Sequence, residues 1–348
     1  METSCTFVVD RLFPPYSQLY LHHDRERAAL WCYLNPDRPC STQTLLGELR
    51  DVQVRARKLL NDSPASTEEL QYLVFASANP AVFSFGGDLE LFVQLIETRD
   101  RDRLYDYGRD CVEFVYQNWS GLESTSLTTI SLVQGMALGG GFEGALSTHV
   151  LIAEENAQLG FPEVLFNMFP GMGAYSLLTR RIEPWRAERL MRSANQYRAR
   201  ELHDMGVVDV LAPDGEGVHA VNDFIRQRRH TRHGQLAIQR VRQRVNPLTR
   251  AELLDVIEIW VDTALGLSAR DLRFMSQIHG AQRRYNGVEE KAGTWMPPAA
   301  NPQPGLTLWQ DERAKRVGLP LRPAALASVP SANVQEIELE KVRPLTVA

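Results

Sequence analysis

The chain has 348 residues, of which 44% are hydrophobic and 23% charged, as in an ordinary globular protein. Its formal net charge of −5 argues against a nucleic-acid-binding protein, which usually carries a basic excess. The cysteines, Cys5, Cys32, Cys40 and Cys111, form no CxxC pair, so we predict neither a disulfide framework nor a zinc site. Since no segment has signal-peptide or membrane-span character, we expect a cytoplasmic protein.

Hydrophobic periodicity predicts alternating strands and helices in the first part of the chain. Apolar and β-branched runs predict strands at Leu19–Leu21, Ala29–Trp31, Tyr72–Ala76, Thr128–Val133 and Val150–Ala153. Helical spacing predicts helices at 42–61, from Asp88 to Leu95, from Leu104 to Val115, and a short one at Gly144–Ser147. The order strand, glycine turn, helix, strand is typical of a stacked α/β core.

The later part of the chain is predicted to be mainly helical. Helices dominate 175–230 around one strand at Val207–Leu211, and a long helical region is predicted from Thr249 to about Gln282. A glutamate stands three residues after Thr249, which is the capping-box spacing of a helix start. Near the C-terminus prolines become frequent, so we expect an extended or partly disordered tail there.

Two glycine-rich turns, at 83–89 and 135–143, each follow a strand and open a helix. Glycine lets a ligand approach the backbone closely, and helix N-termini carry N–H groups without helical acceptors. Two such turns side by side could direct two N–H donors at one carbonyl oxygen, as an oxyanion hole does. Either turn alone is equally well explained as a tight turn that needs glycine. Neither contains the GxxxxGK[ST] pattern of a phosphate-binding P-loop.

These turns are part of a longer pattern that resembles the crotonase (enoyl-CoA hydratase/isomerase) superfamily. The pattern is Phe85-Gly86-Gly87-Asp88-Leu89, Ala137-Leu138-Gly139-Gly140-Gly141-Phe142-Glu143, Pro162-Glu163, and Phe169-Pro170-Gly171-Met172-Gly173. It covers about residues 70–212. The resemblance implies an α/β fold of stacked ββα turns that form two roughly perpendicular sheets. It divides the chain into a ββα core at 1–215, a helical region for acyl binding and oligomerisation at 216–290, and a proline-rich tail at 291–348.

The resemblance also implies the catalytic residues. Gly87 and Gly140 match the positions whose backbone N–H groups form the family's oxyanion hole. Glu143 and Glu163 match the two acid–base carboxylates of its hydratases. Without the resemblance, Glu143 is equally an acid in a first helical turn, where the helix dipole favours it, and Glu163 is a residue of a surface turn.

The predicted substrate-binding residues surround the thioester: Phe85, Gly86, Leu138, Gly139, Met172 and Trp260. Trp260 is expected on the wall of an acyl channel, although its apolar helix face is equally an ordinary core or a trimer interface. No metal site is expected, because His22-His23 has no partner ligands at a suitable spacing, and no cofactor other than the thiol carrier of the substrate. The arginines at 226–244 are either a solvated face or a docking patch for an acidic carrier protein or coenzyme A phosphates.

Several stretches look like one branch of the superfamily, the diffusible-signal-factor synthases, which make cis-2-unsaturated fatty acid signals from 3-hydroxyacyl-acyl carrier protein. The stretches are 85–92, 132–135, 162–166 with 173–176, and 258–264. The resemblance implies a dehydratase and thioesterase of quorum sensing that forms a homotrimer or a dimer of trimers. Alternatives are an enoyl-CoA hydratase or isomerase, and a catalytically weak acyl-binding protein that restrains a sensor kinase. The proline-rich tail departs from that branch.

Overall fold

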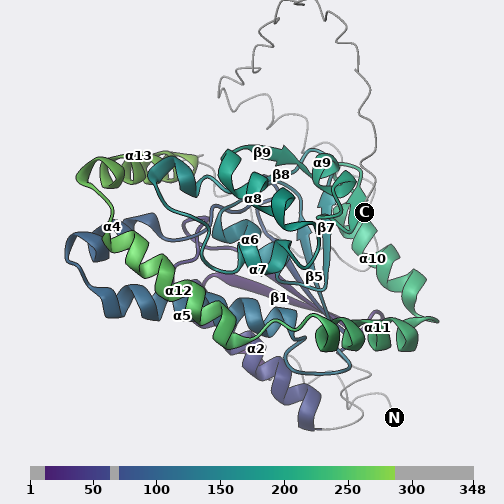
Figure 1. The fold of residues 1–348 in the computed structure, drawn as a ribbon. Coiled ribbons are helices and arrows are strands. Elements are labelled where there is room, and N and C mark those ends of the chain that lie inside the picture. Colours follow the sequence, from purple (N-terminus) through teal and green to yellow (C-terminus); the bar gives the residue numbers. More distant parts are fainter. Residues whose placement is uncertain (1–11, 63–69, 287–348) are drawn as a thin grey trace, which may run out of the picture. The chain divides into compact units, whose positions relative to one another are not determined.

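The computed structural model describes residues 12–62 and 70–286, which form two β-sheets with helices around them (Figure 1). The larger sheet has the strand order β1-β2-β3-β5-β7-β10. Its strands are β1 (Leu19–Asp24), β2 (Ala29–Leu34), β3 (Tyr72–Ser77), β5 (Thr128–Val133), β7 (Val150–Glu154) and β10 (Val210–Ala212). β1 runs antiparallel to β2, and every other neighbouring pair is parallel.

The smaller sheet has the order β4-β6-β8-β9. Its strands are β4 (Val82–Ser84), β6 (Met136–Leu138), β8 (Gln158–Gly160) and β9 (Gln196–Arg198). The pairs β4–β6 and β6–β8 are parallel, and β9 is antiparallel to β8. Along the chain, β4, β6 and β8 each follow a strand of the larger sheet, and each is followed by a helix. This repetition confirms the predicted α/β fold of stacked ββα turns.

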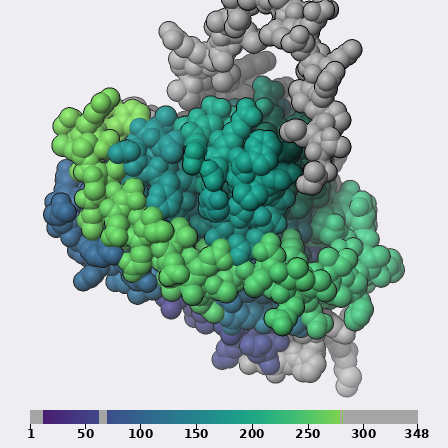
Figure 2. All heavy atoms as spheres, viewed as in Figure 1, coloured from purple at the N-terminus to yellow at the C-terminus, as the bar shows by residue number. Residues whose placement is uncertain are grey.

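The helices of the described residues pack around these sheets. They are α2 (Gln43–Asp62), α4 (Leu89–Glu97), α5 (Arg101–Trp119), α6 (Gly140–Leu146), the 3₁₀ helix η1 (Glu163–Phe166), α7 (Ala174–Leu178), α8 (Pro184–Ser193), α9 (Ala199–Asp204), α10 (Gly217–Arg228), α11 (Arg232–Val245), α12 (Arg250–Leu265) and α13 (Ala269–Asn286). α12 packs along α5 and α13 against α4. Figure 2 shows α12 running across the surface of the displayed face.

The central strands β2, β3, β5 and β7 of the larger sheet are buried on both faces, which explains their almost continuous apolar sequences. Alternate residues of β2 enter different hydrophobic clusters: Leu30 and Cys32 join the cluster that contains α2 and α5, while Trp31 and Tyr33 face the other side. On that second side α10 covers the sheet with Phe224 and its neighbours. The α2–α5 side is the larger cluster, and the functional residues discussed below lie within it.

The predicted helical region from Thr249 to about Gln282 is confirmed, and the structure divides it into two helices, α12 and α13. The amide of Gly266 donates to the carbonyls of the last turn of α12 and ends that helix. Ser268 then starts α13, because its amide donates to Asp271 Oδ2 at 2.9 Å and its hydroxyl accepts from the Asp271 amide at 3.4 Å. The predicted start is confirmed, since the Thr249 hydroxyl accepts from the amide of Glu252.

Other element boundaries also shift. The strand predicted at Val207–Leu211 begins only at Val210, because the amides of Val207 and Val208 donate to the Leu202 carbonyl and close α9. The short helix expected at Gly144–Ser147 begins at Gly140, inside the glycine run. The strands of the smaller sheet were not predicted, because three residues are too few to display an alternating pattern.

The proline-rich tail lies outside the described residues, and the division of the chain at 215 and 290 stays a prediction. Within 12–62 and 70–286, no helix has the length and apolar character needed to span a membrane.

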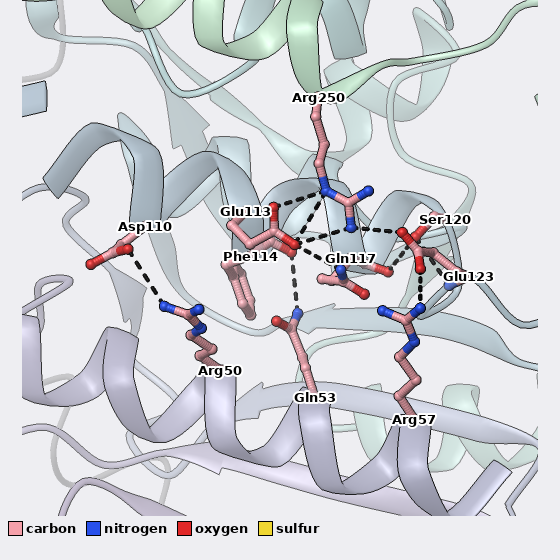
Figure 3. Close-up of polar contacts among 10 residues, drawn as sticks. All are labelled: Arg50, Gln53, Arg57, Asp110, Glu113, Phe114, Gln117, Ser120, Glu123 and Arg250. Carbon is pink, nitrogen blue, oxygen red and sulfur yellow. Dashed lines mark hydrogen bonds and ion pairs between the residues drawn. The ribbon is translucent and has the colours of Figure 1, made fainter. Parts of the chain in front are cut away.

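A polar network joins α2, α5 and α12 (Figure 3). Arg250, at the start of α12, binds Glu113 of α5 at 3.0 Å and Glu123 at 2.6 Å. Its guanidinium also stacks on the ring of Tyr116 at 4.0 Å. Glu123 in turn pairs with Arg57 of α2. One arginine therefore connects the C-terminal helices to the layer that covers the larger sheet.

Replacing Arg250 by alanine is expected to lower the free energy of unfolding by about 1–2 kcal/mol. The two ion pairs are partly exposed and are each worth less than about 1 kcal/mol, to which the ring contact adds a similar amount. Arg50→Ala is the matched control, because Arg50 pairs with Asp110 only at 3.9 Å and is 65% exposed. Its loss should stay within about 0.5 kcal/mol. Urea denaturation of both variants checks this, and equal losses would contradict the network's role.

Candidate active site

The predicted catalytic residues follow the parallel strands of the smaller sheet. Gly87 follows β4, Gly140 follows β6 and Glu163 follows β8, each within three residues of the strand's end. Neighbouring parallel strands end at the same edge of a sheet, so the three segments meet there. Glu143 lies one turn into α6, which begins at the same edge. The sheet therefore brings together residues that are far apart in the sequence.

The two glycine turns are in backbone-to-backbone contact. Gly86 has a positive φ of 87°, and a Cβ on it would lie 2.7 Å from the nitrogen of Gly140, so only glycine fits there. A Cβ on Gly140 would lie 3.5 Å from the nitrogen of Gly87. Gly140 is also the first residue of α6, and the amide of such a residue has no acceptor within its own helix. The amide groups of Gly87 and Gly140 thus lie close together, as an oxyanion hole requires.

Buried polar contacts hold the first turn in place. The hydroxyl of Tyr107 accepts from the amide of Asp88 at 3.2 Å and donates to the carbonyl of Ser41 at 2.6 Å. The Asp88 carboxylate caps α4 and pairs with Arg38 at 2.7 Å. The roles of Tyr107 and Arg38 could not be predicted from the sequence, because both contacts join segments that are distant along the chain. The only signal for Tyr107 was its place on the apolar face of a predicted helix.

Glu143 is almost completely buried, with 1% of its surface exposed. Its Oε1 accepts from the amide of Ala174 at 2.9 Å, at the start of α7. Burial raises the pKa of the Glu143 carboxyl to about 7, although the backbone amides of Ala174 and Met172 partly offset this. A group with such a pKa can both donate and accept a proton at neutral pH.

Glu163 begins η1 beside the second glycine turn. Its Oε2 is buried and has no hydrogen-bond partner among the described residues. Burial, and then the charge of Glu143, raise the pKa of the Glu163 carboxyl well above its ordinary value. A Cβ on Gly139 would lie 2.3 Å from Glu163 Oε1, so the glycine leaves room for this carboxyl. The electrostatic effect of Glu143 on Glu163 agrees with a carboxyl pair at one site.

Two cavities meet at this pair. The larger one, of about 830 Å³, is lined by both glycines and both glutamates: Gly87, Gly140, Glu143 and Glu163, together with Met172. The smaller one, of about 490 Å³, is lined by Phe85, Gly87, Gly139, Glu163 and Trp260 among others. Among the described residues that line the two cavities, neither Gly86 nor Leu138 is present. Leu138 is the last residue of β6, directly before the second glycine turn.

Trp260 lies on α12 and is 4% exposed. Its ring packs edge-on against Phe92, with centroids 5.1 Å apart. A Cβ on Gly171 would lie 2.3 Å from the Trp260 ring, so the glycine of the Phe-Pro-Gly segment is needed to accommodate the indole. Trp260 thus both packs in the core and lines the smaller cavity, and its predicted contact with substrate stays a prediction.

The other predicted features involve side chains away from this site. Of the arginines at 226–244, Arg228 stacks on Phe224 at 3.9 Å and Arg242 on Trp119 at 5.7 Å, so part of this set packs locally. Among the residues that the structure describes, no group of histidine, cysteine, aspartate or glutamate side chains could hold a metal ion.

A chain of stacked ββα turns with these paired glycine turns has the crotonase fold. A sequence model of the family described as enoyl-CoA hydratase/isomerase matches residues 54–262, and the chain belongs to this family. It is 33% identical over 132 residues to a probable enoyl-CoA hydratase of Bacillus subtilis, covering 38% of this chain and 48% of that protein. It is 31% identical over 138 residues, 40% of the chain, to a peroxisomal fatty acid β-oxidation multifunctional protein of Arabidopsis thaliana.

The matched stretch spans only 18% of the length of the Arabidopsis protein and less than half of the Bacillus protein. Among solved structures, an enoyl-CoA hydratase/isomerase of Xanthobacter autotrophicus Py2 is similar with a TM-score of 0.62 and 20% identity. That similarity covers 80% of this chain and 100% of the other. At such low identity, this likeness establishes the fold.

Glu143→Gln is expected to stabilise the protein at pH 8 and to have little effect at pH 5. In the unfolded chain the pKa of this carboxyl is 4.5, whereas in the folded protein burial raises its pKa to about 7. The stability that belongs to the neutral group is therefore fully present below about pH 4.5 and is lost as the pH rises through 7. The glutamine variant should gain about 3 kcal/mol at pH 8, and an equal effect at both pH values in thermal melts would refute the raised pKa.

Proposed function

We propose that the protein is a dehydratase of 3-hydroxyacyl thioesters in which Glu143 and Glu163 are the acid–base pair. One observation carries the proposal: a single cavity is lined by both carboxyls and by both glycines of the paired turns. Dehydration needs a base for the Cα proton and an acid for the departing hydroxyl group. It also needs donors for the thioester oxygen, which becomes negative as the proton leaves.

The carbonyl oxygen of the thioester accepts from the amides of Gly87 and Gly140. Glu163 is assigned as the base that takes the Cα proton, as the resemblance implies. Glu143 protonates the hydroxyl group on Cβ as the C–O bond breaks, so that water leaves and a Cα–Cβ double bond forms. The pair must therefore carry one proton, and the raised pKa values of both carboxyls favour that state at neutral pH. The charge of Glu143 helps to raise the pKa of Glu163 well above its ordinary value, whereas the pKa of Glu143 is raised to about 7, so the electrostatics favour the exchanged roles, with Glu143 as the base and Glu163 as the acid.

The finer proposal is a diffusible-signal-factor synthase, which acts on acyl carrier protein and releases a free cis-2-enoic acid. It is supported by the sequence stretches 85–92, 162–166 and 258–264. The same carboxyl pair would then activate a water molecule that attacks the thioester carbonyl, with the carrier thiol as the leaving group. This function implies a cytoplasmic location, a homotrimer or a dimer of trimers, and a role in quorum sensing. The remaining substrate contacts are assigned to Met172, on the wall of the larger cavity, and to Phe85, Gly139 and Trp260, on the wall of the smaller one.

An enoyl-CoA hydratase or isomerase is the second candidate, favoured by the family to which the chain belongs. Hydration is the reverse of the dehydration described above, so it uses the same groups on a coenzyme A thioester. The third candidate, an acyl-binding regulator of a sensor kinase, requires the cavity but no turnover.

Product analysis with purified protein distinguishes these candidates. A free cis-2-enoic acid from a 3-hydroxyacyl-acyl carrier protein supports the synthase, and reversible hydration of an enoyl-CoA supports the hydratase. Acyl binding without turnover would leave the regulator.

In either enzyme, Glu143→Gln and Glu163→Gln should each lower turnover by about 10²-fold or more, since each removes one proton-transfer group. A variant that retains near-wild-type turnover would remove that glutamate from the mechanism.

A matched pair of substitutions at Gly140 tests the oxyanion hole. Gly140→Pro removes the N–H donor at the first helical position, where proline is tolerated, and should lower kcat by about 10²–10³-fold. Gly140→Ala keeps the donor, and its Cβ makes ordinary contacts at 3.5 Å, so its loss should stay below about tenfold. Steady-state kinetics measure both, with circular dichroism as the control for folding. Similar losses in the two variants would argue against an amide donor at this position.

A further inference from the structure

Both cavities reach Gly87 and Glu163, so either could receive the hydrocarbon tail of an acyl substrate. The ring of Phe92 lies on both walls and separates the two spaces. On one side it packs edge-on against Tyr107, with centroids 4.9 Å apart, and on the other against Trp260. The direction of the tail is therefore a choice between the α2–α5 side and the side of α4, α12 and α13.

We propose that the tail enters the larger cavity, between α2, α5 and the larger sheet, and that this pocket limits the acyl chain to medium length. The proposal rests on the proposed function. The larger cavity alone is lined by both glutamates and both glycines, so the reacting carbons lie in it.

Beyond the reacting groups, the wall of the larger cavity is largely apolar; of its polar residues, Ser84 accepts from the Gly86 amide and Tyr107 donates to the Ser41 carbonyl. α2 contributes successive turns of leucine, β3 contributes Phe75, and α5 contributes Cys111, Phe114 and Val115. The leucines are Leu45, Leu46 and Leu49. A straight hydrocarbon chain loses its contact with water here without leaving any polar group unpaired.

A buried hydrogen-bond bridge lies beyond this apolar wall. Gln53 is one helical turn after Leu49 on α2, and its Nε2 donates to Asn118 Oδ1 at 2.8 Å and to the carbonyl of Phe114 at 3.1 Å. Gln53 is 3% exposed and Asn118 is completely buried. A longer tail would have to separate these groups and leave them unpaired in an apolar environment, which is unfavourable. In this proposal the bridge is what a tail longer than the pocket would meet beyond Leu49.

The test compares two matched substitutions on opposite sides of Phe92. Leu49 lines only the larger cavity and Ile96 only the smaller one, and both are buried aliphatic residues on helices. The substrates are N-acetylcysteamine thioesters of 3-hydroxybutanoic and 3-hydroxydodecanoic acid, which do not depend on the natural carrier. Leu49→Phe should lower the ratio of kcat/KM for the long substrate to that for the short one by about tenfold or more, since it fills the space of a few methylene groups. Ile96→Phe should leave that ratio within about twofold. The opposite outcome, or no change in either variant, would overturn the proposal.

A second measurement does not depend on turnover or on a tolerated substitution. Leu49 and Cys111 line only the larger cavity, and Ile96 and Trp260 line only the smaller one, so a crystal structure of the Glu143→Gln variant with a bound dodecanoyl thioester shows which pocket holds the tail. The tail should lie beside Leu49 and Cys111. A tail held there without turnover by the wild type would reject the proposed enzyme and keep the pocket. Turnover of the long substrate with its tail beside Ile96 and Trp260 would reject the pocket and keep the enzyme.

Discussion

The parallel register of β4, β6 and β8 is the constraint on which the candidate site depends. Each strand has only three residues, yet each ends next to its neighbour, and each is followed by a turn that carries one functional group. A shift of one residue in this register would move a glycine or a glutamate by about 3.3 Å, which is more than the tolerance of a hydrogen bond. The central strands of the larger sheet, buried on both faces, supply the rigid support for these short strands.

Glycine serves two different purposes at this edge. Gly86 and Gly139 lie in positive-φ conformations and are in direct contact with Gly140 and Glu163, so any side chain there would collide with the site itself. Gly87 and Gly140 are proposed to present their amides, and Gly140 has room for a methyl group. Some glycines of the run are therefore required by the backbone conformation, and others are explained by the proposed chemistry. A sequence pattern alone cannot distinguish these two reasons for a glycine.

The sequence predicted the long elements and the family well. The strands and helices of the α2–α5 layer were predicted because apolar residues recur there with clear periods. The family motifs pointed to Gly87, Gly140, Glu143 and Glu163, which the structure brings to one edge of the smaller sheet. Periodicity does not reveal three-residue strands, nor the break between α12 and α13, which depends on local capping by Ser268 and Asp271. Contacts between distant segments, such as Tyr107 with Ser41, leave no sequence signal at all.

The position of the Phe92 ring limits how this protein can diverge. A Cβ on Gly87 would lie 2.6 Å from that ring, and the ring is in turn held between Tyr107 and Trp260. Residues that face different cavities are thus linked through one aromatic side chain beside a proposed oxyanion donor. A change in the size of Trp260 alters the support of the ring and, through it, the space around Gly87. Substrate range and rate are therefore expected to change together in natural or engineered variants, and compensating substitutions should appear in pairs across Phe92.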